Sequence, residues 1–262
     1  MDYSLNGKVA VVTGASRGIG LATSRALASE GVRVVGAART ISPELREVCS
    51  LGVSVDLSTR TGAQELIDMA LAKEGRVDIL VNNVGAGDAN SLKLGGFLDA
   101  DEDQWQRLLD LNLLSAVRTS RAALPSIVEH QGVIVNVSSI NARIPSTGPV
   151  GYSEAKAALT AFSKRLSEEF GPQGVRVNTV SPGPVGTGLW RDSDGFGARV
   201  AEMYGATHEE FLEAMPATFG VASGRIAEPE DVAAFITFLA SPIANSITGA
   251  DLVIDGGTIK TS

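Results

Sequence analysis

The sequence is poor in the residues that cross-link chains or bind metals. Of its 262 residues, only Cys49 is a cysteine and only His130 and His208 are histidines. A single cysteine excludes an intrachain disulfide and a cysteine-based metal cluster. Two histidines this far apart in the chain favour two surface side chains over a zinc site. We therefore expect no metal, and a free thiol suits a reducing compartment.

Positive charge and long apolar runs are scarce as well. Lys and Arg number 22 against 30 Asp and Glu, a formal net charge of −8. A chain of this charge repels polyanions, so we expect neither nucleic-acid binding nor attachment to an anionic membrane. No apolar stretch reaches about 18 residues, and the first eight residues lack the pattern of a secretory signal. These absences predict a cytoplasmic protein.

Short apolar runs, by contrast, recur along the whole chain. Seven are rich in Val and Ile: residues 9–12, 32–38, 53–55, 77–81, 133–137, 175–180 and 252–254. Most lack alternation of apolar and polar residues, which is typical of parallel strands covered on both faces. Stretches of helical period separate them: residues 19–27 and 64–72, residues 105 to about Pro125, and residues 155–166. The alternation predicts an α/β, Rossmann-type, doubly wound parallel sheet, mainly seven-stranded, with helices on both faces.

Aromatic residues are few, at 5%, but glycine is abundant, with 29 residues, and some of it gathers directly after the first apolar run. The turn reads Thr13-Gly14-Ala15-Ser16-Arg17-Gly18-Ile19-Gly20 and leads into the first helical stretch. Glycine adopts backbone angles closed to other residues and lets the backbone approach a pyrophosphate, while a helix N-terminus supplies N–H donors. The position of the turn at a strand-to-helix junction favours dinucleotide binding over a tight turn without a ligand.

The spacing of Gly14, Gly18 and Gly20 resembles the Thr-Gly-x-x-x-Gly-x-Gly signature of the short-chain dehydrogenase/reductase family. The resemblance continues in the family's order through Asn82-Asn83-Val84-Gly85, Asn112, Ser139, Tyr152 with Lys156, and Pro182-Gly183-Pro184-Val185-Gly186-Thr187. It covers essentially the whole chain and is closest to the compact, single-domain members similar to 3-oxoacyl reductases. Val84 and Glu154 depart from the usual residues, but neither departure removes a reacting group.

The resemblance implies a set of cofactor-binding residues. They are Gly14, Ser16, Arg17, Gly18, Ile19, Gly20, Arg39, Asp56, Leu57, Asn83, Val84, Gly85, Tyr152, Lys156, Pro182, Gly183, Val185 and Thr187. The second strand ends at Arg39 with no carboxylate, and an arginine there pairs with the 2′-phosphate of the ribose, so NADP(H) is preferred over NAD(H). Arg17 is a second candidate; alternatively, both arginines are solvated surface cations. Asp56 either meets the adenine or caps the following helix.

The candidate catalytic residues are Ser139, Tyr152, Lys156 and Asn112. Tyr152 and Lys156, four residues apart, share one helix face, where an ammonium lowers the pKa of a phenol. Ser139 follows a parallel strand, where doubly wound folds place their chemistry. The resemblance implies that Ser139 polarises a carbonyl, Tyr152 donates the proton, Lys156 holds the nicotinamide ribose and tunes Tyr152, and Asn112 positions a water. A half-exposed surface pair is the alternative for Tyr152 and Lys156.

These features predict a single dinucleotide-binding and catalytic domain over residues 1–262, with a substrate lid at about 188–224. The reaction implied is hydride transfer between NADP(H) and a small ketone or secondary alcohol. An NAD-dependent alcohol dehydrogenase and a non-catalytic dinucleotide-binding sensor or scaffold remain alternatives. The resemblance also implies a homotetramer or dimer, formed through helices starting near Asp101 and Gly151 and through residues 247–262.

The lid is rich in apolar side chains, which fit either an apolar substrate or packing of the lid onto the body. Thr207 and Glu210 form a capping-box pattern, so a helix is expected near His208. Arg143, Ile144 and the loop from Ala86 to Phe97 are expected to form the other walls of the substrate site.

Overall fold

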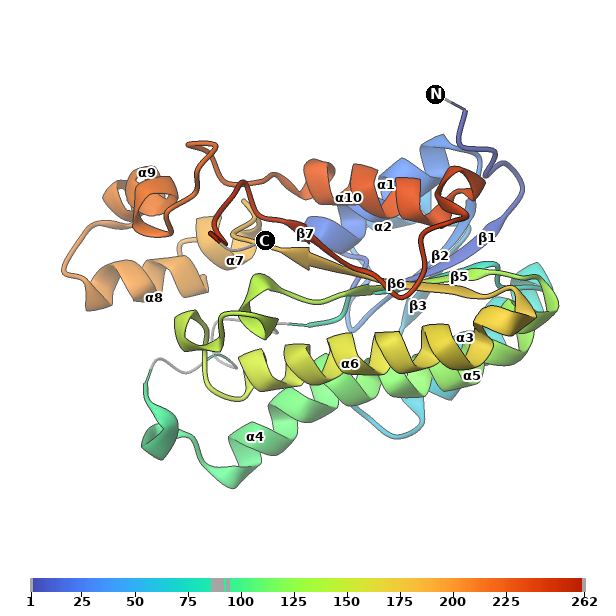
Figure 1. Cartoon of the computed structure of the whole chain (residues 1–262), viewed down its shortest axis with the longest axis horizontal. Helices are drawn as coiled ribbons and strands as arrows, with labels where there is room; N and C mark the ends of the chain where they lie inside the picture. The colour runs from blue at the N-terminus through green and yellow to red at the C-terminus, as the bar shows by residue number, and fades with distance from the viewer. Residues whose placement is uncertain (1, 86–91, 93–94, 261–262) are drawn as a thin grey trace.

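The computed structural model describes residues 2–85, 92 and 95–260, and these contain one parallel sheet (Figure 1). Its strand order is β3-β2-β1-β4-β5-β6-β7. The strands are β1 (Val9–Thr13), β2 (Arg33–Ala38), β3 (Leu51–Ser54), β4 (Ile79–Asn82), β5 (Val133–Val137), β6 (Arg176–Pro182) and β7 (Asp251–Ile254). The chain reverses its direction of travel across the sheet between β1 and β4, where doubly wound folds bind ligands. The predicted fold class and all seven predicted strands are confirmed.

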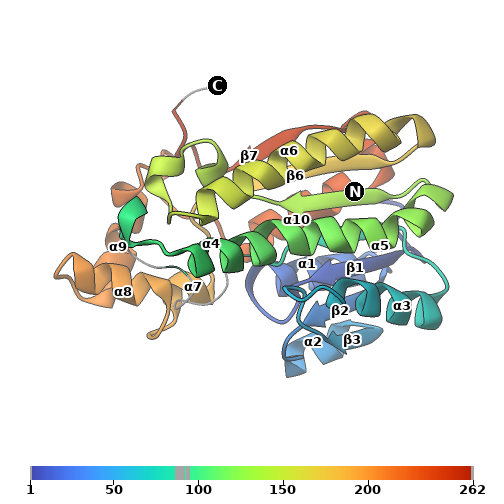
Figure 2. The same ribbon diagram turned by 90° about the horizontal axis from the view of Figure 1, so that it is seen from below.

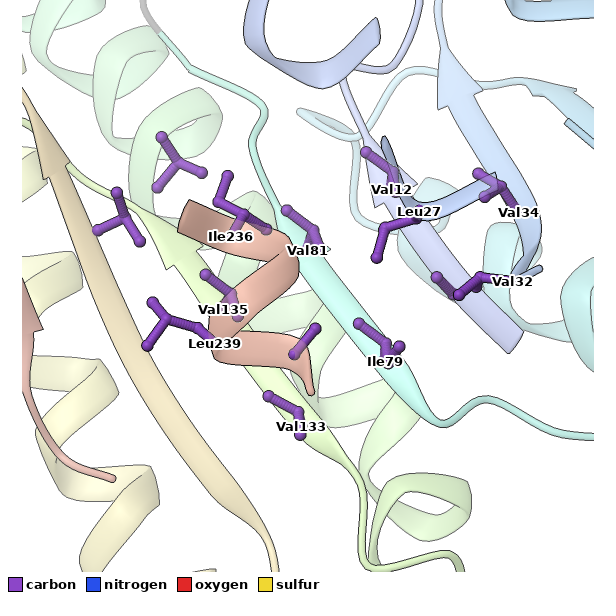
Figure 3. Packing of buried hydrophobic residues seen from close by; sticks show 14 of the residues in the cluster. Val12, Leu27, Val32, Val34, Ile79, Val81, Val133, Val135, Ile236 and Leu239 are labelled. Carbon is purple, nitrogen blue, oxygen red and sulfur yellow. The ribbon is translucent and has the colours of Figure 1, made fainter. Parts of the chain in front are cut away.

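Helices cover both faces of the sheet (Figures 1 and 2). One layer holds α1 (Gly18–Ser29), α2 (Pro43–Val48) and α10 (Pro229–Ala240); the other holds α3 (Gly62–Glu74), α5 (Ser115–Glu129) and α6 (Tyr152–Phe170). Alternate residues of each strand face opposite layers: Val12 packs in a cluster with Leu27 and Ile236, whereas Val11 packs with Leu66. Figure 3 shows the first cluster, in which Ile236 lies over the strand valines. Both faces being buried explains why the strands read as continuous apolar runs.

One predicted helix boundary is wrong. The helix expected to end near Pro125 is instead α4 (Glu102–Leu109), one π-helical turn (Asp110–Leu114) and α5, which continues to Glu129 with Pro125 inside it. Proline removes one helix hydrogen bond, but Ser126 and Ile127 beyond it are buried, and this packing maintains the helix.

The helix α10 and the short helix α2 were not predicted. α10 is buried on one side and begins at Pro229, a good first residue for a helix, with acidic residues in its first turn. The helix-cap alternative for Asp56 is wrong, because Thr61 directly precedes α3 and the Asp56 carboxylate accepts hydrogen bonds from Ser58 instead.

Residues 188–224 form three helices and no strand: α7 (Gly188–Arg191), α8 (Phe196–Met203) and α9 (His208–Thr218). They project beyond the end of the sheet as a separate cluster of helices (Figure 1). The expected capping box is present, since Thr207 Oγ1 accepts from Glu210 N and the Glu210 carboxylate accepts from Thr207 N. Short 3-10 turns occur at Phe97–Asp99, Ile140–Ala142 (η3), Pro145–Thr147, Gly171–Gln173 and Pro242–Ala244. No helix in the described part of the chain is long and apolar enough to cross a bilayer.

Candidate active site

A cavity of about 1050 Å³ opens at the carboxyl ends of the strands. It is lined by the glycine turn, the ends of β2, β4, β5 and β6, the start of α6, and the lid. All the predicted site residues line it except Gly20 and Asn112. The structure therefore brings together residues that lie up to about 170 positions apart in the sequence, from Gly14 to Thr187.

The glycine turn has the shape of an anion cradle. Gly14 and Gly18 adopt φ angles of +64° and +52°, which favour glycine. A Cβ on Gly20 would overlap the Gly14 carbonyl oxygen and lie 2.6 Å from Asn83 Nδ2, so Gly20 is required by packing within the turn. Arg17 precedes α1 without a side-chain cap, and the first turn carries no acidic residue. Uncapped N–H donors beside the cavity fit the diphosphate of a dinucleotide.

The residues that follow β4 are hydrogen-bonded to Thr13 and Gly14, at the start of this turn. Thr13 Oγ1 accepts from Asn83 N at 2.9 Å and from Val84 N at 3.1 Å. Asn83 Nδ2 donates back to the carbonyl oxygens of Thr13 and Gly14, at 2.9 and 3.2 Å. These bonds fix two cavity walls relative to each other, which gives Asn83 a structural reason beyond cofactor contact.

Two arginines line the cavity, Arg17 within the glycine turn and Arg39 directly after β2. Asp56 and Leu57 line it as well. Ser16 Oγ donates to the Thr40 carbonyl at 2.7 Å, which ties the glycine turn to the segment that follows β2. Both arginines thus belong to the cavity that the glycine turn also lines.

Tyr152 and Lys156 lie one turn apart at the start of α6, with Lys156 Nζ 5.8 Å from the centroid of the tyrosine ring. Lys156 is 2% exposed, and its Nζ donates to the Val137 carbonyl at 2.8 Å. Burial lowers the pKa of Lys156 to about 7. The surface-pair alternative is therefore wrong for Lys156, which is a buried amine.

The expected lowering of the tyrosine pKa is also wrong for the protein without ligand. Burial raises the pKa of Tyr152 above its usual value, and the hydrogen bond with Ser139 acts in the opposite direction without overcoming it. Burial also lowers the pKa of Lys156 to about 7, so part of the Lys156 population is unprotonated near neutral pH and stabilises a tyrosinate less. Tyr152 consequently carries its proton at neutral pH, which is the form that an acid needs.

Ser139 follows β5 and precedes the 3-10 turn η3. Its Oγ accepts from Asn141 N at 3.1 Å and donates to Asn141 Oδ1 at 3.2 Å. Ser138 is directed elsewhere, because its hydroxyl donates to the Lys156 carbonyl. Of the two consecutive serines, Ser139 is the one whose side chain hydrogen-bonds with Tyr152.

Asn112 lies behind the cavity wall in the π-helical turn and is fully buried. Its Nδ2 donates to the Leu108 carbonyl at 3.0 Å. A Cβ on Gly85 would lie 2.6 Å from Lys156 Nζ and 2.9 Å from Asn112 Oδ1, so the three residues converge on one point. The π-helical turn, a common feature of functional sites, was not predicted and has no signal in the sequence pattern.

The segment Pro182–Thr187 closes the cavity between β6 and the lid. Gly183 N donates to the Ile254 carbonyl and Gly186 N to the Ala227 carbonyl, at 3.0 and 2.8 Å. Thr187 lies against the glycine turn, since its Cγ2 would be 3.1 Å from a Cβ on Gly18. Two segments of the predicted cofactor site, the glycine turn and residues 182–187, are thus in contact.

The lid is held by an aromatic cluster centred on Trp190. Its ring centroid lies 5.6 Å from that of Phe196 and 5.4 Å from that of Phe219. The same rings also line the cavity, together with Phe211. The packing alternative is confirmed, because these side chains form one cluster with Leu108 and Tyr152 of the body, whereas an apolar substrate stays a prediction.

The structure places only part of the two other predicted walls at the cavity. Ile144 lines the cavity, but Arg143 does not, because its guanidinium is bound to Asp251 on β7. Of the predicted loop 86–97, residues 86–91 and 93–94 lie outside the described residues, whereas Leu92 and Gly95 line the cavity.

The two histidines are half-buried rather than fully on the surface. His130 Nδ1 and the Ser126 carbonyl are 2.8 Å apart, and His208 Nε2 lies 2.7 Å from the Trp190 carbonyl. Across residues 2–85, 92 and 95–260, no group of three or more His, Cys, Asp or Glu side chains gathers as a possible metal site.

Comparison with known proteins agrees with this geometry. The sequence model of the family described as Enoyl-(Acyl carrier protein) reductase matches residues 14–258. The chain belongs to the short-chain dehydrogenase/reductase family, and it is an oxidoreductase of the class that binds a nicotinamide cofactor. The alternative of a non-catalytic sensor or scaffold is thereby set aside.

Among its relatives, the 3-oxoacyl-(acyl-carrier-protein) reductase FabG of Vibrio cholerae is 34% identical over 260 residues, 97% of this chain and 98% of the relative. Meso-2,3-butanediol dehydrogenase of Serratia marcescens is 31% identical over 95% of this chain and 94% of its own. The structure is also similar to L-sorbose reductase from Gluconobacter frateurii complexed with NADPH and L-sorbose, with a TM-score of 0.90, 32% identity and full coverage of both chains.

Proposed function

We propose that this oxidoreductase uses NADP(H) to reduce a ketone to a secondary alcohol, with Tyr152 as the proton donor. The observation that carries the proposal is the convergence of Ser139, Tyr152 and Lys156 on the cavity that also contains the glycine turn and Arg39. Bound NADPH would supply the hydride from its nicotinamide ring. The remaining steps belong to the side chains of the protein.

In this proposal the substrate carbonyl oxygen lies between Ser139 and Tyr152. Ser139 donates a hydrogen bond to that oxygen, which requires its hydroxyl to turn away from Asn141 Oδ1, its acceptor at 3.2 Å. Tyr152, whose pKa is raised by burial, holds the proton until negative charge develops on the substrate oxygen. Proton donation from Tyr152 then completes the alcohol, and oxidation follows the same path in reverse.

Lys156 has two tasks in the proposal. Its Nζ, with the Val137 carbonyl as acceptor, would also donate to the ribose hydroxyls of the cofactor. A protonated Lys156 would stabilise the tyrosinate left after proton donation. Asn112, behind Gly85, would hold a water that reprotonates Lys156. Its buried position close to Lys156 supports this role.

The preference for NADP(H) rests on Arg17 and Arg39, because guanidinium groups pair with a phosphate on the ribose. The structurally similar L-sorbose reductase, which is complexed with NADPH, also supports NADP(H) as the cofactor. An NAD-dependent alcohol dehydrogenase is the second candidate, favoured by the relative named meso-2,3-butanediol dehydrogenase. Cofactor preference separates the two.

The relatives support the class of substrate but not its identity. They are named for a 3-oxoacyl carrier-protein substrate, for butanediol and for a ketose, and all three contain a ketone or a secondary alcohol. The test is a panel of ketones of these three kinds, presented to the purified protein with NADPH. Consumption of NADPH with at least one ketone supports the proposal, and consumption with none contradicts it.

We also propose a cytoplasmic protein with a single domain that forms a homotetramer or dimer and binds neither nucleic acid nor membrane. The helices at the proposed subunit contact begin after Asp101 and Gly151, as expected from the sequence. Size-exclusion chromatography with light scattering tests the assembly, and a monomer would contradict it.

A further inference from the structure

The carboxylate of Asp251, on the edge strand β7, joins two loops that border the candidate active site. One of its oxygens accepts from Ser181 Oγ at 2.5 Å, and the other accepts from Arg143 Nε at 2.9 Å. Arg143 Nη2 also donates to the Asp251 carbonyl, at 2.8 Å. The Asp251 side chain is only 16% exposed, whereas that of Arg143 is 40% exposed, so the ion pair is open to water on the arginine side.

Arg143 is connected to Ser139 by a single rigid turn. Ser139 is the residue that precedes η3 (Ile140–Ala142), and Arg143 is the residue that follows it. Backbone bonds from Ala142 N to the Ser139 carbonyl and from Arg143 N to the Ile140 carbonyl, at 3.0 and 2.9 Å, close this turn. Fixing the guanidinium of Arg143 therefore fixes the orientation of the turn that presents the Ser139 hydroxyl.

Ser181 performs the corresponding task on the other loop. It is fully buried near the end of β6 and directly precedes the cavity-lining segment Pro182–Thr187. Asp251 pairs with Thr179 in the sheet, so its side chain reaches two residues further along β6 to Ser181. One carboxylate thus sets the relative positions of the Ser139 turn and the segment 182–187.

We propose that Asp251 is a positioning residue for the reaction, acting on Ser139 through Arg143 and on the segment Pro182–Thr187 through Ser181. Neither Asp251 nor Arg143 lines the cavity, so neither contacts substrate or cofactor directly. The proposal rests on the function proposed above. A half-exposed ion pair contributes little to stability, so its effect is expected in turnover and cofactor binding.

The test separates the two arms of the carboxylate. Arg143→Gln is expected to lower kcat by about 5- to 50-fold while the Kd for NADPH stays within about twofold, because only the Ser139 turn is released. Arg143→Lys, which keeps one donor, recovers part of the loss. Ser181→Ala is expected to raise the Kd for NADPH instead, because it releases the segment 182–187.

Asp251→Asn is expected to show both defects, and Arg143→Gln in that background lowers kcat no further. Arg165→Gln is the matched control, because Arg165 forms an exposed pair with Glu169 on α6. The inference is overturned if Arg143→Gln matches Arg165→Gln in kcat, or if the Arg143 and Asp251 losses multiply. Should Asp251→Asn fail to fold, the two single variants at Arg143 and Ser181 still decide.

Failure of the proposed function has a different signature. In that case wild-type protein consumes no NADPH with any ketone. If the positioning role alone fails, the wild-type enzyme is active and Arg143→Gln has the same kcat as Arg165→Gln. The Kd measurements need no turnover and are therefore independent of the substrate.

Discussion

Buried charged side chains lie at both ends of the parallel strands, but the groups that surround them differ. At the amino ends of the strands, Asp78 is nearly fully buried, yet its carboxylate accepts from Val9 N at 2.9 Å, Arg76 Nε at 2.9 Å and Lys8 Nζ at 3.3 Å. Arg176 at the same edge donates to the carbonyls of Leu239 and Ser241, at 2.8 and 3.0 Å. A cavity of about 520 Å³ also lies there, lined by these satisfied groups.

At the carboxyl ends, by contrast, the buried amine of Lys156 donates to a neutral group, the Val137 carbonyl. Lys156 is as buried as Asp78, but no carboxylate of the described residues forms an ion pair with it, and burial lowers its pKa to about 7. Desolvation would raise the pKa of Asp78, but the hydrogen bonds and charges around it lower that pKa on balance. A charge with its own partners indicates a structural role, whereas a charge left short of partners indicates a place for a ligand.

The largest expected effect is at Tyr152. Tyr152→Phe keeps the ring and removes the proton, so turnover should fall by about 10² to 10⁴. Binding of NADPH should be retained, because the change removes one hydroxyl. Steady-state kinetics and calorimetry measure the two quantities, with Tyr3→Phe as the matched control, because Tyr3 is partly buried against the core. Near-normal turnover would refute Tyr152 as the acid.

The second prediction concerns Asp78, at the amino ends of the strands, where a substitution should leave turnover unchanged. Asp78→Asn should lower the free energy of unfolding by about 1–3 kcal/mol, because Arg76 and Lys8 lose their charged partner. The pKa of Asp78 is lower in the folded protein, so its stabilisation is present above about pH 4 and is lost as the pH falls further. Denaturant titrations at neutral and acid pH measure this.

Asp68→Asn, on the exposed face of α3, serves as the control for the stability measurement. A loss of activity in Asp78→Asn with unchanged stability would contradict the structural role assigned to the amino ends of the strands.

The third prediction concerns the arginines. Arg39→Asp should reverse the cofactor preference by at least about tenfold, or about 1.4 kcal/mol, since a carboxylate repels the 2′-phosphate and accepts from ribose hydroxyls. Calorimetric titration with NADPH and NADH measures it, with the exposed Arg46→Asp on α2 as the control. Unchanged discrimination would mean that Arg39 is a bystander.

The last prediction concerns the stability gained when the buried lysine is removed. The pKa of Lys156 is about 7 in the folded protein and about 10.4 when unfolded, so folding opposes its protonation and the cost is complete below pH 7. Lys156→Met should therefore raise the melting temperature at pH 6, and the gain should shrink as the pH rises from about 7 to about 10. Thermal denaturation without cofactor measures it.

Lys164→Met, at an exposed position of the same helix, should show no such pH dependence. A constant difference between Lys156→Met and wild type across the pH range would contradict the lowered pKa.

How much the sequence predicts depends on whether a feature is local. The strands were predicted because burial on both faces leaves a continuous apolar run, and the glycine turn because its spacing is contiguous. The π-helical turn that carries Asn112 has no comparable signature, and Pro125 inside α5 argued for a helix end that tertiary packing overrides.

Contacts between distant segments were beyond the sequence. Arg143 was expected on a cavity wall because it lies between Ser139 and Tyr152 in the chain, but Asp251, 108 residues away, holds it elsewhere. The raised pKa of Tyr152 likewise follows from burial. Tyr152 packs against a cluster that contains the lid residues Phe196 and Phe211, and a helical spacing of four residues does not reveal this contact.

The most direct test of the central claim is a calorimetric titration of the wild-type protein with NADPH and then with NADH. The claim is that the cavity at the carboxyl ends of the strands binds the cofactor and that Arg17 and Arg39 select its phosphate. It predicts NADPH binding tighter by at least about tenfold. Equal affinities, tighter NADH binding, or no binding of either would contradict it.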